Sequence, residues 1–466
     1  MMTRLSTIDS MAVETEVDQR NPWLADGFIT GLIVALLNSS VLGSLPVFSS
    51  LPVDLTALVG FTLGVTTLLT LCARMQWLTG FAPVAVLFAT CIPAVLLSSF
   101  NEYGQTKIPS FFFITCLATA AAVTLVRTRP RILWLLWWFA LAGLLEIIIA
   151  QAQAVGMGEE RLALVGSNTV HLGRAAGAAI CVIGVLILHL QRRRARGWMW
   201  GIMGCGVVVA FLAGSAFATG SRGPLIALAA AVILVAISVP GTPIRRAARL
   251  ALATVALLIF ALWGLSNAPE LSEQRIKGII DGNEDASALA RARLYSATLA
   301  LAVLRPLGVG WGDLSAELPP WAQLDSGLRQ YPHNIFVEVG VEGGWIAAAA
   351  LVAVVVLALT RARALLRQLE GIGVMSLLWF FLLNACLSGD VNDNRAFFVM
   401  LGVALGLPAV RRELHASSPP AGWVVARPSV VRRSYGFTTF GATSSLNGFL
   451  KPSEADDASF RREQLR

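Results

Sequence analysis

The chain has 466 residues, of which 56% are hydrophobic and only 14% are charged, and its formal net charge is +8 at pH 7. Its mean hydropathy is +0.69, whereas an ordinary soluble domain carries about 25% charged residues. These values exclude a soluble globular protein and predict a polytopic integral membrane protein. The period of two that marks a membrane β-barrel is absent, so we expect an all-α fold.

Twelve apolar segments are long enough to cross a bilayer, which requires about 20 residues of helix. They cover approximately residues 26–46, 53–72, 78–98, 109–126, 132–151, 170–190, 198–217, 223–240, 248–267, 335–358, 372–388 and 396–410. The first segment lies too far from the N-terminus to be a cleaved signal peptide, so we expect it to be retained.

Arginines fix the predicted orientation, because short cytoplasmic loops carry an excess of Lys and Arg. Clusters such as "RTRPR" (127–131) and "QRRRARG" (191–197) fall in alternate connections, and further arginines flank the first and last spans. Both termini are therefore expected in the cytoplasm, and the net charge reflects topology rather than binding to nucleic acid. The one long connection, 268–334, then faces outward.

Three regions are expected along the chain. They are a cytoplasmic segment (1–25), a transmembrane domain (26–410) and a disordered cytoplasmic tail (411–466) that mixes Pro, Ser, Gly and charge without periodicity. The six cysteines lie within or at the ends of apolar spans and include no CxxC pair, so neither a disulfide framework nor a zinc site is expected.

Four polar clusters lie at the outer ends of the predicted spans. They are "GSNTVHLGR" (166–174), "TGSRGP" (219–224), "YPHNIFVEVGVEGG" (331–344) and "SGDVNDNR" (388–395). Ionisable groups at membrane depth cost about 2.5 to 3.5 kcal/mol each, so they usually face a cavity or the interior of a helix bundle. Each residue alone is also explained as a helix cap at the membrane interface. Four clusters on one side favour a shared, outward-facing cavity.

Arg222 lies in a turn too short for its guanidinium to leave the membrane surface. Gly223 and Pro224 suit a tight turn into the next helix, with the proline at the first helical position. An arginine beside a helix N-terminus makes a phosphate cradle, and the alternative is an arginine paired with a lipid headgroup.

Residues 286–303 of the outer connection have helical periodicity. Apolar residues recur three or four apart along one face from Leu289 to Val303, while Arg291 and Arg293 project to different sides. This helix is either re-entrant or surface-lying and carries an arginine to the cavity, or it is a solvated amphipathic helix.

The segment 331–344 opens the tenth predicted span. Pro332 fits a helix beginning, which would place His333 and Asn334 in the first turn, with Glu338 and Glu342 on the face of Asn334. With an ordinary pKa of about 6.5, His333 can act as a general base or, when neutral, donate a hydrogen bond to a phosphate oxygen. The alternative is a histidine that only fixes the loop.

The order "GSRGPLIALAAAVILV", "RARLYSATLALAVLRPLGVGWG", "PHNIFVEVGVEGGW" and "SGDVNDNR" resembles the O-antigen ligase and polymerase superfamily of bacterial cell envelopes. The resemblance covers roughly residues 165–410, and the first five spans match only in being hydrophobic. It implies a GT-C-like, metal-independent and cofactor-free inverting glycosyltransferase at the outer face of the inner membrane. The implied donor is a glycan on undecaprenyl pyrophosphate.

The resemblance also implies roles for single residues. The motif histidine falls on His333, and the loop arginines fall on Arg222 and on Arg291, which precedes the aromatic Tyr295 by four residues, with Arg293 as a rival. Glu338 would orient His333 or replace it as the base. Further candidates for the cavity are Asn334, Arg174, Asp390 and Arg395. "GDVNDN" (389–394) is the nearest approach to a divalent-cation site and is kept as an alternative to the metal-free reading.

The acceptor stays open at this point. A ligase transfers the glycan to lipid A core, which the large outer connection favours, whereas a polymerase transfers it to a second lipid-linked glycan and a protein-glycosylating relative to Ser or Thr. A transporter of lipid-linked saccharide is the more distant alternative. It would need polar residues through the full depth of the bundle, and the cytoplasmic halves of these spans are almost purely apolar.

Overall fold

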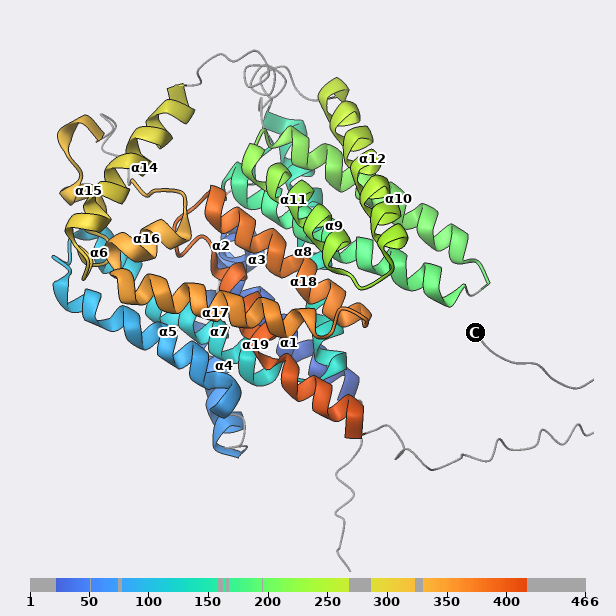
Figure 1. Ribbon diagram of the computed structural model, residues 1–466, viewed down its shortest axis with the longest axis horizontal. Coiled ribbons are helices and arrows are strands. Elements are labelled where there is room, and N and C mark those ends of the chain that lie inside the picture. Colours follow the sequence, from blue (N-terminus) through green and yellow to red (C-terminus); the bar gives the residue numbers. More distant parts are fainter. Residues whose placement is uncertain are drawn as a thin grey trace, which may run out of the picture. The chain divides into compact units, whose positions relative to one another are not determined.

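A computed structural model describes residues 22–50, 52–73, 78–157, 162–164, 167–194, 196–267, 286–322 and 330–416. Within these ranges the chain forms helices and no strand, as Figure 1 shows, so the predicted all-α fold is confirmed. The predicted N-terminal segment lies almost entirely outside the described residues, and so does the predicted tail beyond Ala416.

Helices occupy the positions of the predicted spans. They are α1 (Pro22–Leu37), α4 (Leu55–Ala73), α5 (Leu78–Leu97), α6 (Glu102–Pro109) with the π-helical η2 (Ser110–Thr115) and α7 (Cys116–Leu125), α8 (Arg129–Met157), α9 (Thr169–Arg193), α10 (Trp198–Ala218), α11 (Arg222–Ser238), α12 (Pro243–Asn267), α16 (Ile335–Glu342) with α17 (Trp345–Arg363), α18 (Leu369–Leu387) and α19 (Arg395–Ala416). Short helices α2 (Ser39–Ser44) and α3 (Pro46–Ser49) follow α1.

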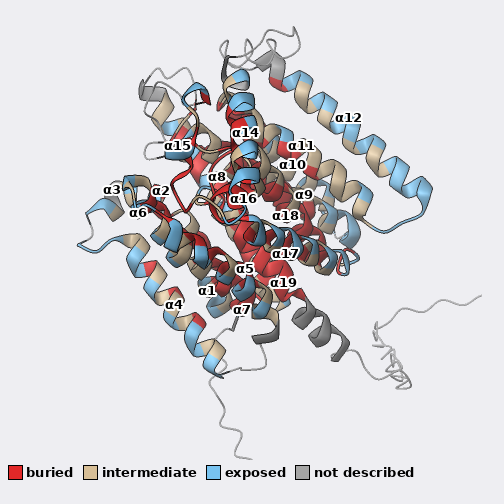
Figure 2. Ribbon diagram, turned by 60° about the vertical axis from the view of Figure 1, so that its left-hand side comes forward, coloured by how far each residue is buried: buried red, intermediate tan, exposed pale blue. Residues whose placement is uncertain are grey.

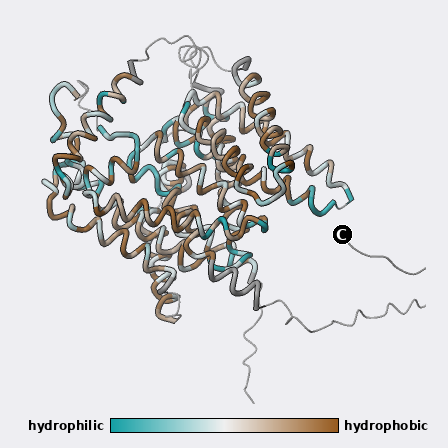
Figure 3. The backbone as a smooth tube through the Cα atoms, in the orientation of Figure 1, coloured by the Kyte–Doolittle hydropathy of each residue, from teal (hydrophilic) through white to brown (hydrophobic). Residues whose placement is uncertain are grey.

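Nine helical segments of the described chain are long and apolar enough to cross a membrane. Shorter apolar helices, Trp23–Leu37, Arg222–Ser238 and Arg395–Leu407, stand at the three other predicted positions. The central lengths of the long helices are coloured hydrophobic in Figure 3. The chain is thus a multi-pass membrane protein, and the number of twelve spans stays a prediction.

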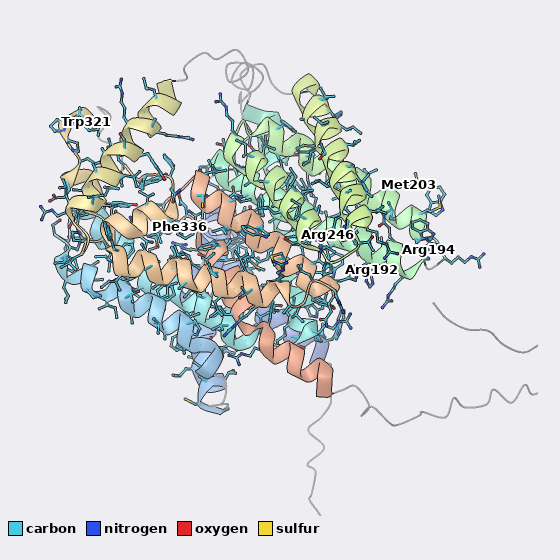
Figure 4. All side chains as sticks on the ribbon, in the orientation of Figure 1. Arg192, Arg194, Met203, Arg246, Trp321 and Phe336 are labelled. Carbon is cyan, nitrogen blue, oxygen red and sulfur yellow. The ribbon has the colours of Figure 1, made fainter. Side chains whose placement is uncertain are left out.

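Ion pairs join the starts of three helices at one end of the bundle. Arg131 on α8 donates to Asp26 on α1 at 2.6 Å, and Arg129 pairs with Glu370 at the start of α18. Figure 4 shows Arg192, in the last turn of α9, and Arg194, its C-cap, on the side of the molecule away from Trp321. The alternating topology predicts the starts of α1, α8 and α18 on the same side of the membrane, and the ion pairs bring these starts together. The side that faces the cytoplasm stays a prediction.

Helix α18 lies at the centre of the bundle and α12 at its edge. The apolar window of α18 is 78% buried, whereas that of α12 is only 6% buried, and Figure 2 shows α12 exposed along its length. Because a row of exposed leucine and isoleucine side chains would be unfavourable in water, this surface of α12 is suited to contact with lipid.

The outer connection contains α14 (Ala286–Leu304), α15 (Leu314–Glu317) and the 3₁₀ turn η3 (Pro320–Ala322). The extent of α14 agrees with the predicted helix, but its apolar stripe does not face the protein. Leu299 and Val303 are exposed, while Ala297 on the opposite face and Ala302 on the flank of the helix are buried. These small residues let α14 pack closely against a cluster that includes Leu314, Leu318 and Val341.

The predicted continuous span 335–358 is wrong, because the chain breaks between α16 and α17 at Gly343 and Gly344. Gly344 has φ +87°, and a Cβ there would lie 2.7 Å from the carbonyl carbon and oxygen of Leu307. Trp345 N donates to Pro306 O at 2.9 Å across the break. The outer connection therefore occupies the space that a straight helix would need.

Candidate functional site

His333 lies in a short segment before α16, not in the first helical turn. The prediction that Pro332 begins the helix is wrong, because Asn334 is the N-cap: its Oδ1 accepts from the backbone N–H of Phe336 at 3.0 Å and of Val337 at 3.3 Å. An Asn side chain satisfies the first free N–H groups of a helix, which a proline cannot do. His333 itself adopts φ +54°.

The His333 imidazole is partly buried among positive charges. Burial, and to a smaller extent the nearby Arg291 and Arg174 guanidinium groups, lower its pKa to about 4. Its Nδ1 atom is buried without a hydrogen-bond partner. Its ring packs edge-on against that of Tyr331, with 4.6 Å between the ring centroids. The imidazole is therefore neutral at pH 7, with one nitrogen free to accept or donate a proton.

Arg174, on the first turns of α9, holds the 388–394 loop. Its terminal nitrogens donate to Ser388 O at 2.6 Å and to Asp393 O at 2.8 Å, while its Nε atom has no partner. Asp390 accepts from Asn392 N and Asp393 N through Oδ1, at 2.9 and 2.8 Å. The loop is thus fixed by its own carboxylate and by an arginine of another helix.

The start of α11, with Arg222, lies beside this loop. Ser221 Oγ donates to Thr169 Oγ1 on α9 at 3.1 Å, and a Cβ on Gly223 would lie 3.6 Å from Ser388 Cβ. Pro224 is the third residue of α11, so its predicted place at the first position is corrected. Three of the four predicted outer clusters therefore lie in contact. The fourth contains His333, whose pKa the Arg174 charge helps to lower.

A cavity of about 540 Å³ opens between α8, α9, the 388–397 segment and Tyr331. Its polar lining includes predicted and unpredicted residues: Arg174, Arg395, Tyr331, Asn392, Asp393, Glu146 and His171. Burial raises the pKa of Tyr331 to about 12, so its hydroxyl stays protonated. This volume is in the range of small-molecule sites.

A buried ion cluster fixes the helix that follows His333. Lys107 Nζ on α6 lies 2.5 Å from Glu338 Oε1 and 2.7 Å from Glu342 Oε2 on α16. Glu342 Oε2 also accepts from Gly312 N at 3.0 Å. Glu338 and Glu342 share a face of α16, as their spacing predicts, but Glu338 contacts Lys107 and no hydrogen bond to His333 is present among the described residues.

The glycine-rich stretch 306–313 is fixed on the outer ends of α5 and α6. Trp311 Nε1 donates to Cys91 O at 3.0 Å, and Asp313 accepts from Ser99 N at 2.6 Å. A Cβ on Gly312, which has φ +86°, would lie 2.6 Å from Gly104 Cα. These contacts and the ion cluster hold α16 in one place relative to the bundle.

Residues 207–352 match the family model described as O-antigen ligase. This match supports membership of the O-antigen ligase and polymerase superfamily. No curated protein matches the chain. The matched region contains Arg222, Arg291 and His333, whereas Arg174 and the 388–395 loop lie outside it. The family is one of membrane glycosyltransferase-like enzymes.

The O-antigen ligase domain presents its two loop arginines differently. Both Arg291 and Arg293 are exposed on α14, but only Arg291 is among the charges that act on the pKa of His333. Arg291 is therefore the better candidate for the site. Arg395 lines the cavity and donates through one terminal nitrogen to Ser110 Oγ at 2.5 Å.

Several polar residues near these groups were not predicted as site residues. Tyr103, whose hydroxyl donates to Asp390 Oδ2 at 2.5 Å, Tyr331, Lys107 and Glu146 are the main ones. Two signals were present in the sequence: Lys107 is the only lysine before residue 277, and Glu146 is a carboxylate inside an apolar run. No group of three or more metal-ligating side chains occurs in the part of the chain that the structure describes.

Proposed function

We propose that the chain is an O-antigen ligase, which transfers a glycan from undecaprenyl pyrophosphate to a hydroxyl of lipid A core at the periplasmic face of the inner membrane. The observation that carries the proposal is the neutral imidazole of His333, which is near the Arg291 and Arg174 charges and packs on Tyr331, a residue that lines the polar cavity together with Arg174. A neutral base beside fixed cations is what a transfer from a pyrophosphate requires.

The arginines supply the electrostatic part of this mechanism. As the bond between the anomeric carbon and the pyrophosphate oxygen breaks, the leaving group takes the electron pair and its negative charge rises. In the proposed mechanism, Arg222, at the N-terminus of α11, and Arg291, on the outer helix α14, bind that charge. Arg293, on another side of α14, is given no direct contact with the donor.

His333 supplies the proton acceptor. The acceptor hydroxyl oxygen attacks the anomeric carbon from the side opposite the pyrophosphate, which inverts the configuration, and its proton passes to a ring nitrogen of His333. A histidine with a pKa near 4 is deprotonated before the reaction, and the arriving pyrophosphate raises that pKa during it. If His333 instead donates a hydrogen bond to a phosphate oxygen, the acceptor hydroxyl loses its proton without the help of the imidazole.

Glu338 acts indirectly in this proposal. Its carboxylate is fully buried against Lys107, so it neither receives the acceptor proton nor contacts His333. We give it a positioning role, through α16 and the cap residue Asn334. Asp390 has a similar role in the 388–394 loop, because both of its carboxylate oxygens accept hydrogen bonds from the protein.

Transfer by the purified protein in detergent tests the proposal. The assay contains undecaprenyl pyrophosphate-linked glycan and, in separate reactions, lipid A core or a second lipid-linked glycan, each with and without chelator. We expect transfer to lipid A core that the chelator leaves unchanged. Transfer only to the second glycan would identify a polymerase, transfer to neither would reject the glycosyltransferase proposal, and loss with chelator would reject the metal-free mechanism.

The orientation is tested separately in cells. A protease site introduced near residue 280 should be cleaved in intact spheroplasts, because the outer connection would face the periplasm. Protection of this site, with cleavage of the C-terminal tail, would invert the proposed topology.

A further inference from the structure

A second histidine and carboxylate face the cavity at a place that the proposed transfer does not use. His171 lies on the first turn of α9, and Glu146 lies within α8. His171 Nε2 is 3.1 Å from Glu146 Oε2, and both residues line the cavity. The Glu146 side chain is 8% exposed and that of His171 is 32% exposed, so the carboxylate holds the imidazole while the ring stays open to the cavity.

The pair is costly to keep in an apolar helix. Glu146 follows Leu144 and Leu145 and precedes three isoleucines in the sequence, and a carboxylate within a membrane span usually marks a functional site. No cap or loop depends on it, because the N-cap of α9 is Asn168, whose side chain accepts from His171 N at 2.7 Å. The fixed imidazole therefore has a purpose other than ending a helix.

The charges of the cavity balance. Arg174 and Arg395 contribute two positive charges, and Glu146 and Asp393 contribute two negative charges. The region of His333 differs, since the charges that act on the pKa of His333 are the positive charges of Arg291 and Arg174. A pyrophosphate is thus better matched to the His333 side, and an uncharged ligand to the cavity itself.

The remaining lining suits a sugar. Amide and hydroxyl groups of Asn38, Ser167, Asn168 and Asn392 stand around the pair, and Asn392 Oδ1 is buried without a hydrogen-bond partner. The apolar part includes aromatic rings: Phe139 and Phe381 pack with 5.5 Å between their ring centroids and both line the cavity. Sugar rings present hydroxyl groups at their edge and C–H groups on their faces, which this combination complements.

We infer that the Glu146–His171 pair and the amides around it form the subsite for an uncharged sugar residue of the acceptor. This inference rests on the proposed function and specifies where that reaction holds its acceptor. His171 is a binding and positioning residue here, which hydrogen-bonds a sugar hydroxyl, and Glu146 fixes the orientation of its ring. Tyr331, between this cavity and His333, separates the acceptor subsite from the base.

Substrate kinetics on the full-length protein in detergent test the inference. The variants are His171→Asn, Glu146→Gln and the double variant, and the matched control is His189→Asn, which changes a histidine of the same helix that does not line the cavity. We expect each single variant to raise the KM for the acceptor roughly 10- to 100-fold, because a hydrogen bond to a charged or fixed group is lost. The KM for the lipid-linked donor should not change.

The double variant distinguishes a pair from two independent residues. If Glu146 acts only through His171, the double variant loses no more than His171→Asn alone. Additive losses would overturn the paired role, and unchanged acceptor KM in His171→Asn would overturn the subsite. A raised KM for the donor alone would assign the cavity to the donor sugar and also overturn the inference.

Direct binding tests the subsite without the transfer reaction. Saturation-transfer NMR with methyl α-D-glucopyranoside and the methyl glycoside of N-acetylglucosamine should give signals with the wild-type protein and His189→Asn that His171→Asn abolishes. Inorganic pyrophosphate should not displace these glycosides. Absence of glycoside signals with the wild type, or their displacement by pyrophosphate, would reject the uncharged-sugar subsite. Absence of any transfer by the wild type would instead reject the proposed function.

Discussion

Lys107 on α6 contacts both glutamates of α16, at 2.5 Å from Glu338 Oε1 and 2.7 Å from Glu342 Oε2, and all three side chains are excluded from solvent. The Lys107 ammonium also lies over the Tyr103 ring, 5.2 Å from its centroid. The outer end of the fourth predicted span is thereby joined to the helix that follows His333. Removing one charge of such a cluster leaves the others buried without compensation.

Lys107→Met should therefore lower the stability of the protein. We expect a loss of roughly 3–5 kcal/mol, because two glutamates lose the buried cation that they share, and thermal unfolding in detergent measures it. The triple variant with Glu338→Gln and Glu342→Gln should recover part of the loss, since it removes the uncompensated charges. An unchanged unfolding temperature in Lys107→Met would show that the cluster does not hold α16.

His333→Asn should abolish transfer while leaving expression and folding intact. Asparagine tolerates the left-handed conformation that His333 adopts at φ +54° better than most residues, so this change removes the imidazole and spares the backbone. His189→Asn is the matched control. Transfer assays on protein of equal unfolding temperature measure the effect, and wild-type activity in His333→Asn would remove this residue from the site.

The stability of the protein should fall at acidic pH because His333 has a lowered pKa in the folded state. Its pKa is about 4 in the folded protein and about 6.5 when unfolded, so between these values the unfolded chain binds more protons. The stabilisation from the neutral imidazole is complete above about pH 6.5 and is lost as the pH falls towards 4. In this window, the unfolding temperature of the wild type should fall more steeply than that of His333→Asn. Parallel curves would contradict the lowered pKa.

Arg291→Ala and Arg293→Ala form a matched pair on one exposed helix. We expect Arg291→Ala to reduce kcat by roughly 10²- to 10³-fold, as for loss of one donor to the developing charge, and Arg293→Ala to have little effect. Arg291→Ala should also raise the pKa of His333, because it removes a nearby positive charge. NMR of ¹⁵N-histidine-labelled protein reads this directly, since the chain has only four histidines. Equal losses in both variants would contradict the assignment.

Gly312→Ala should destabilise the contact between the outer connection and the bundle. The new Cβ would meet Gly104 Cα at 2.6 Å, and φ +86° is unfavourable for any residue with a side chain, which costs about 1–3 kcal/mol before the clash is counted. Gly184→Ala, where nothing lies within 4 Å of the added Cβ, is the control. Thermal unfolding of both variants is the measurement, and similar temperatures would contradict the close approach.

The positions of the helices could be predicted because apolar length is a local property. Helices lie at every predicted span, although the spans 26–46 and 335–358 are each divided among several helices, and the outer helix 286–303 has nearly its predicted bounds. The face of α14 was less predictable. Leu299 and Val303 were expected to form its apolar face, yet beside a membrane an apolar side chain is also stable at the surface, so hydrophobicity alone does not identify the side that packs on the protein.

The candidate site was predicted in part. His333, Arg174 and Arg222 come from outer clusters that the structure brings together, because helix ends on one side of a bundle are neighbours. Lys107 and Glu146 were missed as site residues, since each depends on a partner far away in the sequence: Glu338 lies on another helix, and so does His171. The broken helix at Gly344 was missed because the approach of residue 307 cannot be read from local sequence.

The break at Gly343 and Gly344 makes the position of α16 independent of the tilt of the membrane-spanning helix α17. A helix that spans the hydrocarbon tilts or shifts when its length and the local membrane thickness differ. Helix α17 can tilt or shift in this way. Helix α16 lies before the two glycines and is held in place by Lys107 and by the 306–312 stretch. We therefore expect the position of His333 to be insensitive to hydrophobic mismatch, so that the same reaction geometry persists in membranes of different lipid composition.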